Sequence, residues 1–425
     1  MKKQKLFQLS RLLIGRALIG STLMASSFKG SRLIEKILCI FFSGVLFSGM
    51  AFADQSDWFQ RSNWSAFVSQ TAIYSSDYNF LSQSDDSLSF DMWEAGFLAS
   101  TVVKEKLTFS AQVLGRKVSE ASGDDLRADY AFFSYPFYQT MTDTLGVRIG
   151  RIRSSYGLYN ETRDMPHTRT GIVMPQSIYF DMTRNSFYSA DGIEFFGYRD
   201  FDDQRLSAQI FFSKPVADED EISQIAQLTP SNLEGDKSLL FKISYGSEYD
   251  GLRSSFTYYR PEYKVDVSLP VGVMTIFEDD ASVYSESMVT SLEYNQFDWS
   301  ITVEYLRHKF ETNIPALENI PGFQAKNTGY EEAFYIQGLY RFSEQWESYI
   351  RYDSSEGHKN ETLKDNEKWH DINFGGSFRP SESWLLRAEF HYVDGLARLF
   401  GRDNAFSEKQ DPYWTAAMFQ VAYKW

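Results

Sequence analysis

The chain contains little cysteine, histidine and proline, and it has no long apolar run beyond residue 53. Its single cysteine, Cys39, lies near the amino terminus, so the remaining chain must be stable without disulfides. A helix needs roughly 20 consecutive apolar residues to cross a bilayer, and residues 54–425 therefore exclude a helical membrane protein. The five histidines show no metal-binding spacing such as His-Glu-x-x-His, and no Gly-x-Ser-x-Gly motif occurs. No cofactor, metal site or catalytic residue is therefore predicted.

Basic residues are also scarce relative to acidic ones. The formal net charge of −15 makes nucleic acid a poor candidate partner. The mean hydropathy of −0.37 is typical of a soluble β-protein, and equally of a membrane barrel whose strands alternate apolar and polar residues.

The amino-terminal segment has a different composition from the rest. Residues 1–53 carry eight Lys or Arg and one acid, and they contain an apolar run at 38–47 followed by the small-x-small sequence Ala-Phe-Ala. This order predicts a secretory signal that is cleaved before Asp54. Met24 would give a signal of more usual length. A retained anchor is the alternative, although the apolar run is short for a span.

Short segments of alternating character recur through the remaining chain. Between Trp299 and Leu306, for example, apolar side chains occupy the odd positions and mostly polar ones the even positions. A period of two over about ten residues places one set of side chains on each face of a β-strand. Cut in this way, a single domain with sixteen strands is predicted, at 63–74, 87–102, 105–117, 126–138, 143–153, 187–199, 203–213, 237–246, 251–265, 282–294, 297–309, 329–342, 345–354, 368–379, 383–393 and 412–425.

The connections between these strands alternate in length. The even ones are short, as at 103–104 and 343–344, and the odd ones are long, as at 154–186 and 394–411. A transmembrane barrel with both chain ends in the periplasm requires this alternation. We therefore expect an all-β fold, a transmembrane antiparallel β-barrel of about 16 strands, with fourteen or eighteen strands as the open alternatives.

The two faces of the predicted strands also differ. One face carries aromatic residues near both strand ends, as in Trp299 with Tyr305 and Trp384 with Tyr392, where a membrane would have its headgroups. A soluble β-sandwich with one solvated face is the alternative. The opposite face carries charges that suit a watery lumen and would be costly in a dry core, namely Glu304, Glu347, Arg351, Arg387 and Glu389.

The last predicted strand ends on an aromatic residue. Phe419, Val421, Tyr423 and Trp425 share one face of it. This pattern resembles the C-terminal signal by which outer-membrane barrels are recognised for insertion. The resemblance implies that the barrel-assembly machinery, outer-membrane lipids and lipopolysaccharide are partners, after signal-directed export to the outer membrane.

The connection at 154–186 is too long to be an ordinary loop without a function. It lies between the fifth and sixth strands and contains apolar residues such as Ile172 and Phe180, which an exposed tip would not need. The chain here resembles Gram-negative outer-membrane porins of the sixteen-stranded type, whose corresponding loop folds into the barrel and narrows it. The stretch from Gly150 through Tyr156-Gly-Leu-Tyr to Gly192 is similar to porin-related proteins.

If this loop folds inward, its charges become candidates for a pore constriction that biases ion entry. The alternative for each of them is a structural ion pair that holds the loop against the wall, and the excess of arginine suggests a mild anion preference. The acidic runs at 218–221 and 278–280 are predicted to be solvated, with divalent-cation binding as the alternative. The constriction candidates are Arg148, Arg153, Glu161, Arg163, Asp164, His167, Arg169, Asp181 and Arg184, and Arg116 is expected on the wall nearby.

These features favour an outer-membrane porin that passes small hydrophilic solutes by passive diffusion, and the resemblance implies a homotrimer. A non-conducting barrel that acts as an adhesin or structural protein is the main alternative. An outer-membrane hydrolase is a further alternative, because a serine from a distant strand could approach His391 and Glu389. A channel specific for sugars or fatty acids is a variant of the porin hypothesis.

Overall fold

A computed structural model describes residues 61–119, 125–219, 221–222, 230–247, 250–271, 274–318, 320, 322, 324–358, 368–404 and 411–425. The predicted signal segment lies outside the described residues. Within the described residues no helix is both long enough and apolar enough to cross a membrane.

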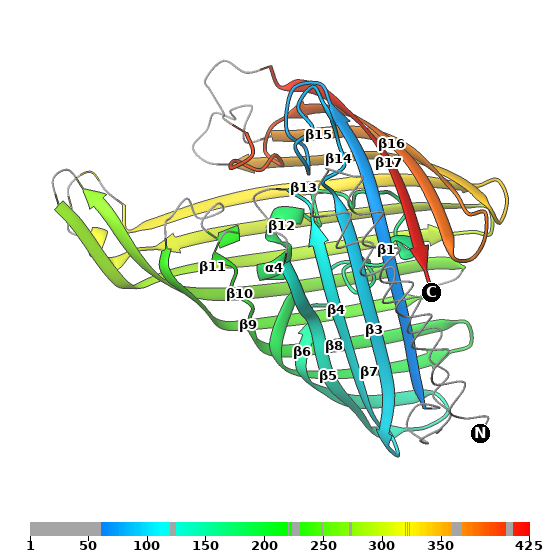
Figure 1. Ribbon diagram of the computed structural model, residues 1–425. Coiled ribbons are helices and arrows are strands. Elements are labelled where there is room, and N and C mark those ends of the chain that lie inside the picture. The colour runs from blue at the N-terminus through cyan, green and yellow to red at the C-terminus, as the bar shows by residue number, and fades with distance from the viewer. Residues whose placement is uncertain are drawn as a thin grey trace, which may run out of the picture. The chain divides into compact units, whose positions relative to one another are not determined.

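The described chain consists almost entirely of antiparallel strands (Figure 1). They are β1 (Ser62–Ser75), β2 (Leu88–Ser89), β3 (Trp93–Lys104), β4 (Leu107–Lys117), β5 (Asp125–Gln139), β6 (Asp143–Arg153), β7 (Ser189–Phe201), β8 (Gln204–Pro215), β9 (Pro230–Gly246), β10 (Gly251–Val271), β11 (Met274–Asn295), β12 (Trp299–Asn313), β13 (Lys326–Arg341), β14 (Trp346–His358), β15 (Lys368–Phe378), β16 (Trp384–Gly395) and β17 (Tyr413–Lys424).

Sixteen of these strands form one closed ring. Each strand from β3 to β17 pairs with the next along the chain, and β1 pairs with both β3 and β17. At the seam, Phe67 lies opposite Lys424, and the Trp425 N–H donates to the Ala66 carbonyl at 2.9 Å. Closure matters because an open sheet would leave a row of unpaired backbone groups at each edge. The predicted sixteen-stranded barrel is confirmed.

The ring exposes apolar side chains on its outer face and buries polar ones on its inner face, the reverse of a soluble protein. On β12 and β13 the outward-facing Ile301, Tyr305 and Ile336 are exposed, whereas the inward-facing Glu304 and Gln337 are buried. The alternation predicted from the sequence thus places the apolar set outside and the charged set inside. A soluble sandwich would bury the apolar set, so this alternative is excluded.

Short turns join the strands at one end of the barrel. Two of them depend on a residue with left-handed backbone, Glu105 between β3 and β4 and Asp202 between β7 and β8, with φ of 49° and 48°. Such turns match the twist of the flanking strands. The predicted strand at 87–102 is shorter, because only β2 forms from its first residues and pairs with β1 outside the ring.

The largest departure from the predicted strands is the β10–β11 hairpin. The segment 266–281 was expected to be a connection, yet the two strands continue their pairing past a bulge between Val265 and Val267 as far as the pair Val271 and Met274. Cross-strand pairing therefore extends through a segment that the alternation pattern had assigned to a connection.

Candidate functional site

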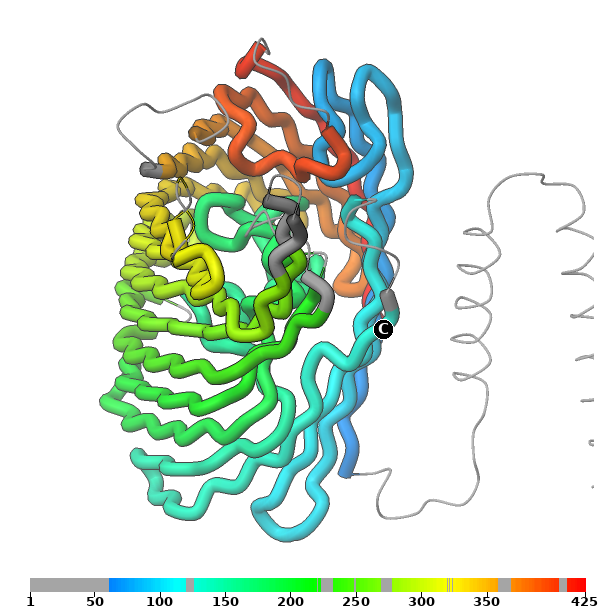
Figure 2. The backbone as a smooth tube through the Cα atoms, turned by 90° about the vertical axis from the view of Figure 1, so that its left-hand side faces the viewer, coloured from blue at the N-terminus to red at the C-terminus, as the bar shows by residue number. Residues whose placement is uncertain are grey.

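The connection between β6 and β7, residues 154–188, lies inside the ring of strands and is called the inward loop below (Figure 2). It contains two 3-10 turns, η1 (Pro166–Thr168) and η2 (Asp181–Thr183), and the four-residue helix α4 (Arg184–Phe187). Its side chains bond to β3 and β4 on one side and to β11, β12 and β13 on the other. The inward loop therefore crosses the lumen and does not lie along one wall only.

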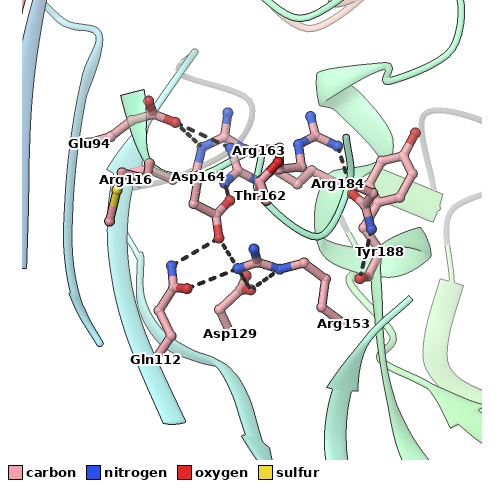
Figure 3. Close-up of polar contacts among 12 residues, drawn as sticks. Glu94, Gln112, Arg116, Asp129, Arg153, Thr162, Arg163, Asp164, Arg184 and Tyr188 are labelled. Carbon is pink, nitrogen blue, oxygen red and sulfur yellow. Dashed lines mark hydrogen bonds and ion pairs between the residues drawn. The ribbon is translucent and has the colours of Figure 1, made fainter. Parts of the chain in front are cut away.

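Glu94 of β3 is the first anchor of the inward loop (Figure 3). Its carboxylate lies 2.6 Å from the Arg169 guanidinium and 3.2 Å from that of Arg184. On the neighbouring strand, Arg116 is the direct cross-strand partner of Glu94, with its Nε 3.8 Å from the carboxylate. All four side chains are buried. A buried carboxylate is stable only with such partners, so Glu94 and the two loop arginines depend on each other.

A second ionic group joins β4 and β5 to the same loop. Arg153, at the end of β6, bonds to Asp129 at 3.0 Å through its Nε, and it also contacts Asp164. The Gln112 amide donates to Asp164 at 2.9 Å, and Arg184 contacts the other oxygen of Asp164. Asp164 is therefore surrounded by three donors from three different parts of the chain.

Asp181 is the last carboxylate of this set of buried charges. It accepts hydrogen bonds from Arg116 at 3.0 Å and from Arg163 at 3.2 Å. The Arg163 guanidinium also lies 4.7 Å from the centre of the Tyr188 ring, a cation–π contact. Five buried arginines are thus matched by four buried carboxylates, and we call this set the charged layer (Arg116, Arg153, Arg163, Arg169, Arg184, Glu94, Asp129, Asp164 and Asp181).

On β14 and β16, carboxylates hold the backbone of the inward loop. Asp353 of β14 accepts the N–H groups of Gln176 at 2.7 Å and Ser177 at 3.2 Å. Glu389 of β16 accepts the N–H groups of Ile172 and Val173 at 2.5 and 3.4 Å. These bonds satisfy loop amides that have no strand partner, which fixes the loop without a regular secondary structure.

Two arginines of the same two strands bond to the loop carbonyls. Arg351 donates to the Val173 carbonyl at 3.1 Å, and Arg387 donates to the carbonyls of Gly171, at 3.0 Å, and of Arg169. The sequence had placed both arginines in a watery lumen. The structure places them in the lumen, but bound to protein.

Glu304 of β12 holds the first part of the inward loop. It accepts the Leu158 N–H at 3.0 Å and the Tyr179 hydroxyl at 2.6 Å. Burial, and then the charge of Glu304, raise the pKa of Tyr179 well above its ordinary value, so this hydroxyl stays protonated. Gly157 has φ of +58°, and a Cβ there would lie 2.4 Å from the Tyr179 hydroxyl. The Tyr-Gly-Leu-Tyr sequence at 156–159 therefore requires its glycine.

The loop extends to the short-turn end of the barrel, where the His167 Nε2 lies 3.1 Å from the Ser383 carbonyl, between β15 and β16. Burial, followed by the charge of Lys424, lowers the pKa of His167 to about 4. Neutral His167 therefore donates its Nε2–H to this carbonyl near pH 7.

One acidic run outside the inward loop also holds it. Glu221, in the connection between β8 and β9, accepts the N–H groups of Asn185 at 2.8 Å and Ser186 at 2.7 Å. Burial and the neighbouring Asp218 raise the pKa of Glu221 to about 8. Asp218 accepts a bond from the Asn185 side chain at 2.8 Å. These two residues of the run at 218–221 therefore bond to protein, where solvated charges were expected.

One part of the interior, on β5 to β8, is accessible to solvent. Glu161 is 41% exposed at the edge of the inward loop and pairs with Lys242 at 3.4 Å. Arg148 is 25% exposed, lies 2.6 Å from Glu194, and has its guanidinium 4.6 Å from the centre of the Phe196 ring. We call the half-exposed inward face of β5 to β8 the open wall (Phe132, Ser134, Pro136, Arg148, Phe196, Tyr198, Ser207 and Gln209).

The nine sequence-predicted constriction residues therefore separate into three groups. Arg148 and Glu161 face the accessible part of the lumen, and His167 lies at the short-turn end. The other six belong to the charged layer, namely Arg153, Arg163, Asp164, Arg169, Asp181 and Arg184.

Sequence reasoning did not identify the wall residues that hold the loop, Glu94, Gln112, Asp129 and Asp353. Their only signal in the sequence is a polar residue at an inward position of a strand. Within the described part of the chain, no group of three or more His, Cys, Asp or Glu residues could hold a metal ion.

The chain is similar in structure to outer-membrane proteins. OmpT of Vibrio cholerae superimposes with a TM-score of 0.53 at 15% identity, over 86% of this chain and 99% of that one, in a form described as a trimer. The outer membrane channel DcaP of Acinetobacter baumannii gives a TM-score of 0.50 at 12% identity, over 86% and 97%. OmpF of Salmonella typhi, in complex with daunomycin, gives 0.51 at 12% identity, over 86% and 97%.

No family model matches the sequence, and no curated protein matches it either. At these identities the structural likeness shows the fold, which is that of the outer-membrane porin-type β-barrels.

Proposed function

We propose that this chain is an outer-membrane channel through which small hydrophilic solutes diffuse passively, and that the open wall is their path. The observation that carries the proposal is the unequal exposure of the barrel interior. Inward side chains of β12 to β17 are mostly buried, whereas the residues of the open wall on β5 to β8 are half exposed and mostly polar or aromatic.

The inward loop acts in this proposal as the constriction. It crosses the lumen and leaves only one exposed edge, formed by Glu161, Thr162 and Thr168. A solute that follows the open wall passes this edge. DcaP is described as a channel, and one OmpT form as a trimer. By likeness to them we propose the same activity and a trimeric assembly for this chain, after export by a cleaved signal.

Ion selectivity is proposed to be weak. Four buried carboxylates offset all but one of the five arginine charges of the charged layer, so this layer contributes little field to the accessible lumen. The accessible charges Glu161 and Arg148 are each paired with a buried charge of opposite sign, Lys242 and Glu194. Removing one member of a pair should therefore produce a preference for anions or for cations that the intact pair suppresses.

Planar-bilayer recording tests this proposal. The protein should give stepwise currents, and Glu161→Gln should shift the reversal potential in a salt gradient toward anion preference. Arg148→Gln should shift it toward cations. Lys214→Gln is the matched control, because Lys214 lies on the outer face of β8 and pairs with Glu234 there. Equal reversal potentials for all four proteins would remove the open wall from the ion path.

A non-conducting adhesin or structural barrel is the second candidate. The inward loop bonds to both sides of the ring, whereas a loop that lies along one wall needs bonds to that wall only. These additional bonds across the lumen favour a non-conducting barrel. Silent bilayers with correctly folded protein would select this candidate over the channel.

A further inference from the structure

The outer face of the barrel has a hollow where two small residues lie side by side. Gly197 of β7 is the cross-strand partner of Ala208 of β8. Leu145 flanks this pair on β6, and Ile243 flanks it on β9. The exposed neighbours Phe195 and Leu145 show that this row faces outward. Two small residues between larger ones leave a depression in an otherwise bulky apolar surface, although Leu145 fills part of it beside Gly197, where an added Cβ would lie 2.6 Å from the Leu145 Cδ2.

Large apolar side chains form the sides of the hollow. Phe195, Ile210 and Phe241 stand on one side, and Phe201 and Leu206 stand on the side nearer the turn between β7 and β8. The hollow has a volume of about 670 Å³. This volume falls within the range of roughly 300–1,000 Å³ that is typical of sites for small molecules.

A charged pair forms the rim of the hollow at the short-turn end. Arg199 of β7 lies opposite Asp143 of β6, and its Nε is 2.5 Å from the Asp143 carboxylate. Both residues line the hollow, and the Arg199 side chain is 58% exposed. Only Nε of Arg199 has a hydrogen-bond partner among the described residues, so the two terminal nitrogens remain available as donors.

The position of this rim indicates the kind of ligand. In outer-membrane barrels the short turns lie on the periplasmic side, and basic residues at the edge of the apolar band face the lipid headgroups. An apolar hollow that ends at a guanidinium with two available nitrogens matches a molecule with a hydrocarbon chain and an anionic oxygen group. A guanidinium can donate two parallel hydrogen bonds to a phosphate.

We infer that this hollow binds one anionic phospholipid, with an acyl chain over Gly197 and Ala208 and the phosphate on Arg199. The inference goes beyond solute passage and requires only that the barrel is embedded in a membrane. Asp143 orients the guanidinium through Nε, and the aromatic side chains hold the acyl chain against the wall. The bound lipid thereby covers the small-residue row, which packs poorly against freely moving lipid.

Native mass spectrometry of the intact protein in detergent, titrated with phosphatidylglycerol, tests this inference. Arg199→Gln should weaken binding by about fivefold, the effect expected for one basic residue at a lipid headgroup. Ala208→Leu should abolish the tight binding event, because the larger side chain fills the hollow. Ala388→Leu is the matched control, since Ala388 is also an exposed outward alanine, on β16. It should bind like the wild type.

Equal lipid affinity in the wild type and in all three variants would overturn the inference. A change of oligomeric state in Ala208→Leu, with lipid affinity unchanged, would overturn it too and would assign the hollow to contact between copies. Conductance separates this inference from the proposed function. Ala208→Leu should conduct normally, so a channel that is silent in every variant would refute only the channel proposal.

Discussion

The two sides of the barrel interior are built from similar residues but differ in what contacts them. Inward charges of β12 to β17, such as Asp353 and Glu389, are bonded to loop amides and are buried. Inward charges near β5 to β8, such as Arg148, remain accessible to solvent. An inward charge on a barrel strand therefore does not by itself indicate a solvent-exposed surface, because a loop can cover it.

Replacing residues 163–183 with a short Gly-Ser linker should have the largest effect on the difference in exposure between the two sides of the interior. The replacement removes the inward loop from both walls, so single-channel conductance should increase several-fold as the covered side becomes accessible. Planar-bilayer recording measures it. Unchanged conductance would mean that the inward loop does not limit the path. Folding of the variant is checked by its heat-modifiable mobility on gels.

Glu94→Gln should be the most destabilising single substitution. Arg169 and Arg184 would then remain buried with a lost carboxylate partner, which costs about 3–5 kcal/mol of unfolding free energy. Urea unfolding in lipid vesicles measures this cost. Glu161→Gln is the comparison on the accessible side, and it should cost roughly 0–1 kcal/mol because that pair is partly solvated. Similar costs for the two variants would contradict the difference between the walls.

Gly157→Ala should loosen the first part of the inward loop. The left-handed backbone costs a non-glycine residue about 1–3 kcal/mol. The new Cβ would also lie 2.4 Å from the Tyr179 hydroxyl, which must then move away from Glu304. Hydrogen exchange at Leu158 and Tyr159 should become faster. Gly338→Ala is the control, since no atom lies within 4 Å of its added Cβ. Unchanged exchange in Gly157→Ala would argue against this anchor.

Acidification should have the smallest effect, and it should be visible at the end of the loop at His167. Its pKa is lowered to about 4 in the folded chain, against about 6.5 when unfolded. The contact with Ser383 is therefore fully stable above pH 6.5 and weakens as the pH falls toward 4. Lys424, Arg387 and Arg379 oppose protonation of the imidazole.

Hydrogen exchange around residue 167 should accordingly increase between pH 6.5 and 4. His167→Gln should remove this dependence while it keeps a donor for the Ser383 carbonyl. If the same increase occurs in His167→Gln, another group must titrate.

The ring was predictable from the sequence because each strand carries its own signal. The alternation from Trp299 to Leu306 specifies both faces of β12 without knowledge of any other strand. The position of the inward loop between β6 and β7 followed from its length and its apolar residues.

The contacts of the inward loop were not predictable in the same way. Arg169 and Glu94 are separated by 75 residues, and Ile172 and Glu389 by 217. Which acid meets which arginine depends on how deep the loop descends, and no local pattern encodes that depth. The length of the β10–β11 hairpin was also missed, because the pairing of residues 266–281 depends on the partner strand and not on a pattern within one strand.

Cysteine accessibility in the folded barrel distinguishes the open wall from the buried inward positions of β14 and β15. The native sequence has only Cys39, in the predicted signal, so introduced thiols have no background in the mature chain. Ser134→Cys and Ser207→Cys lie on the open wall, and Ser355→Cys and Ser377→Cys lie at buried inward positions of β14 and β15. A water-soluble thiol reagent should modify the first two and reduce their currents, and leave the second two unmodified. Equal modification at all four positions would contradict the account.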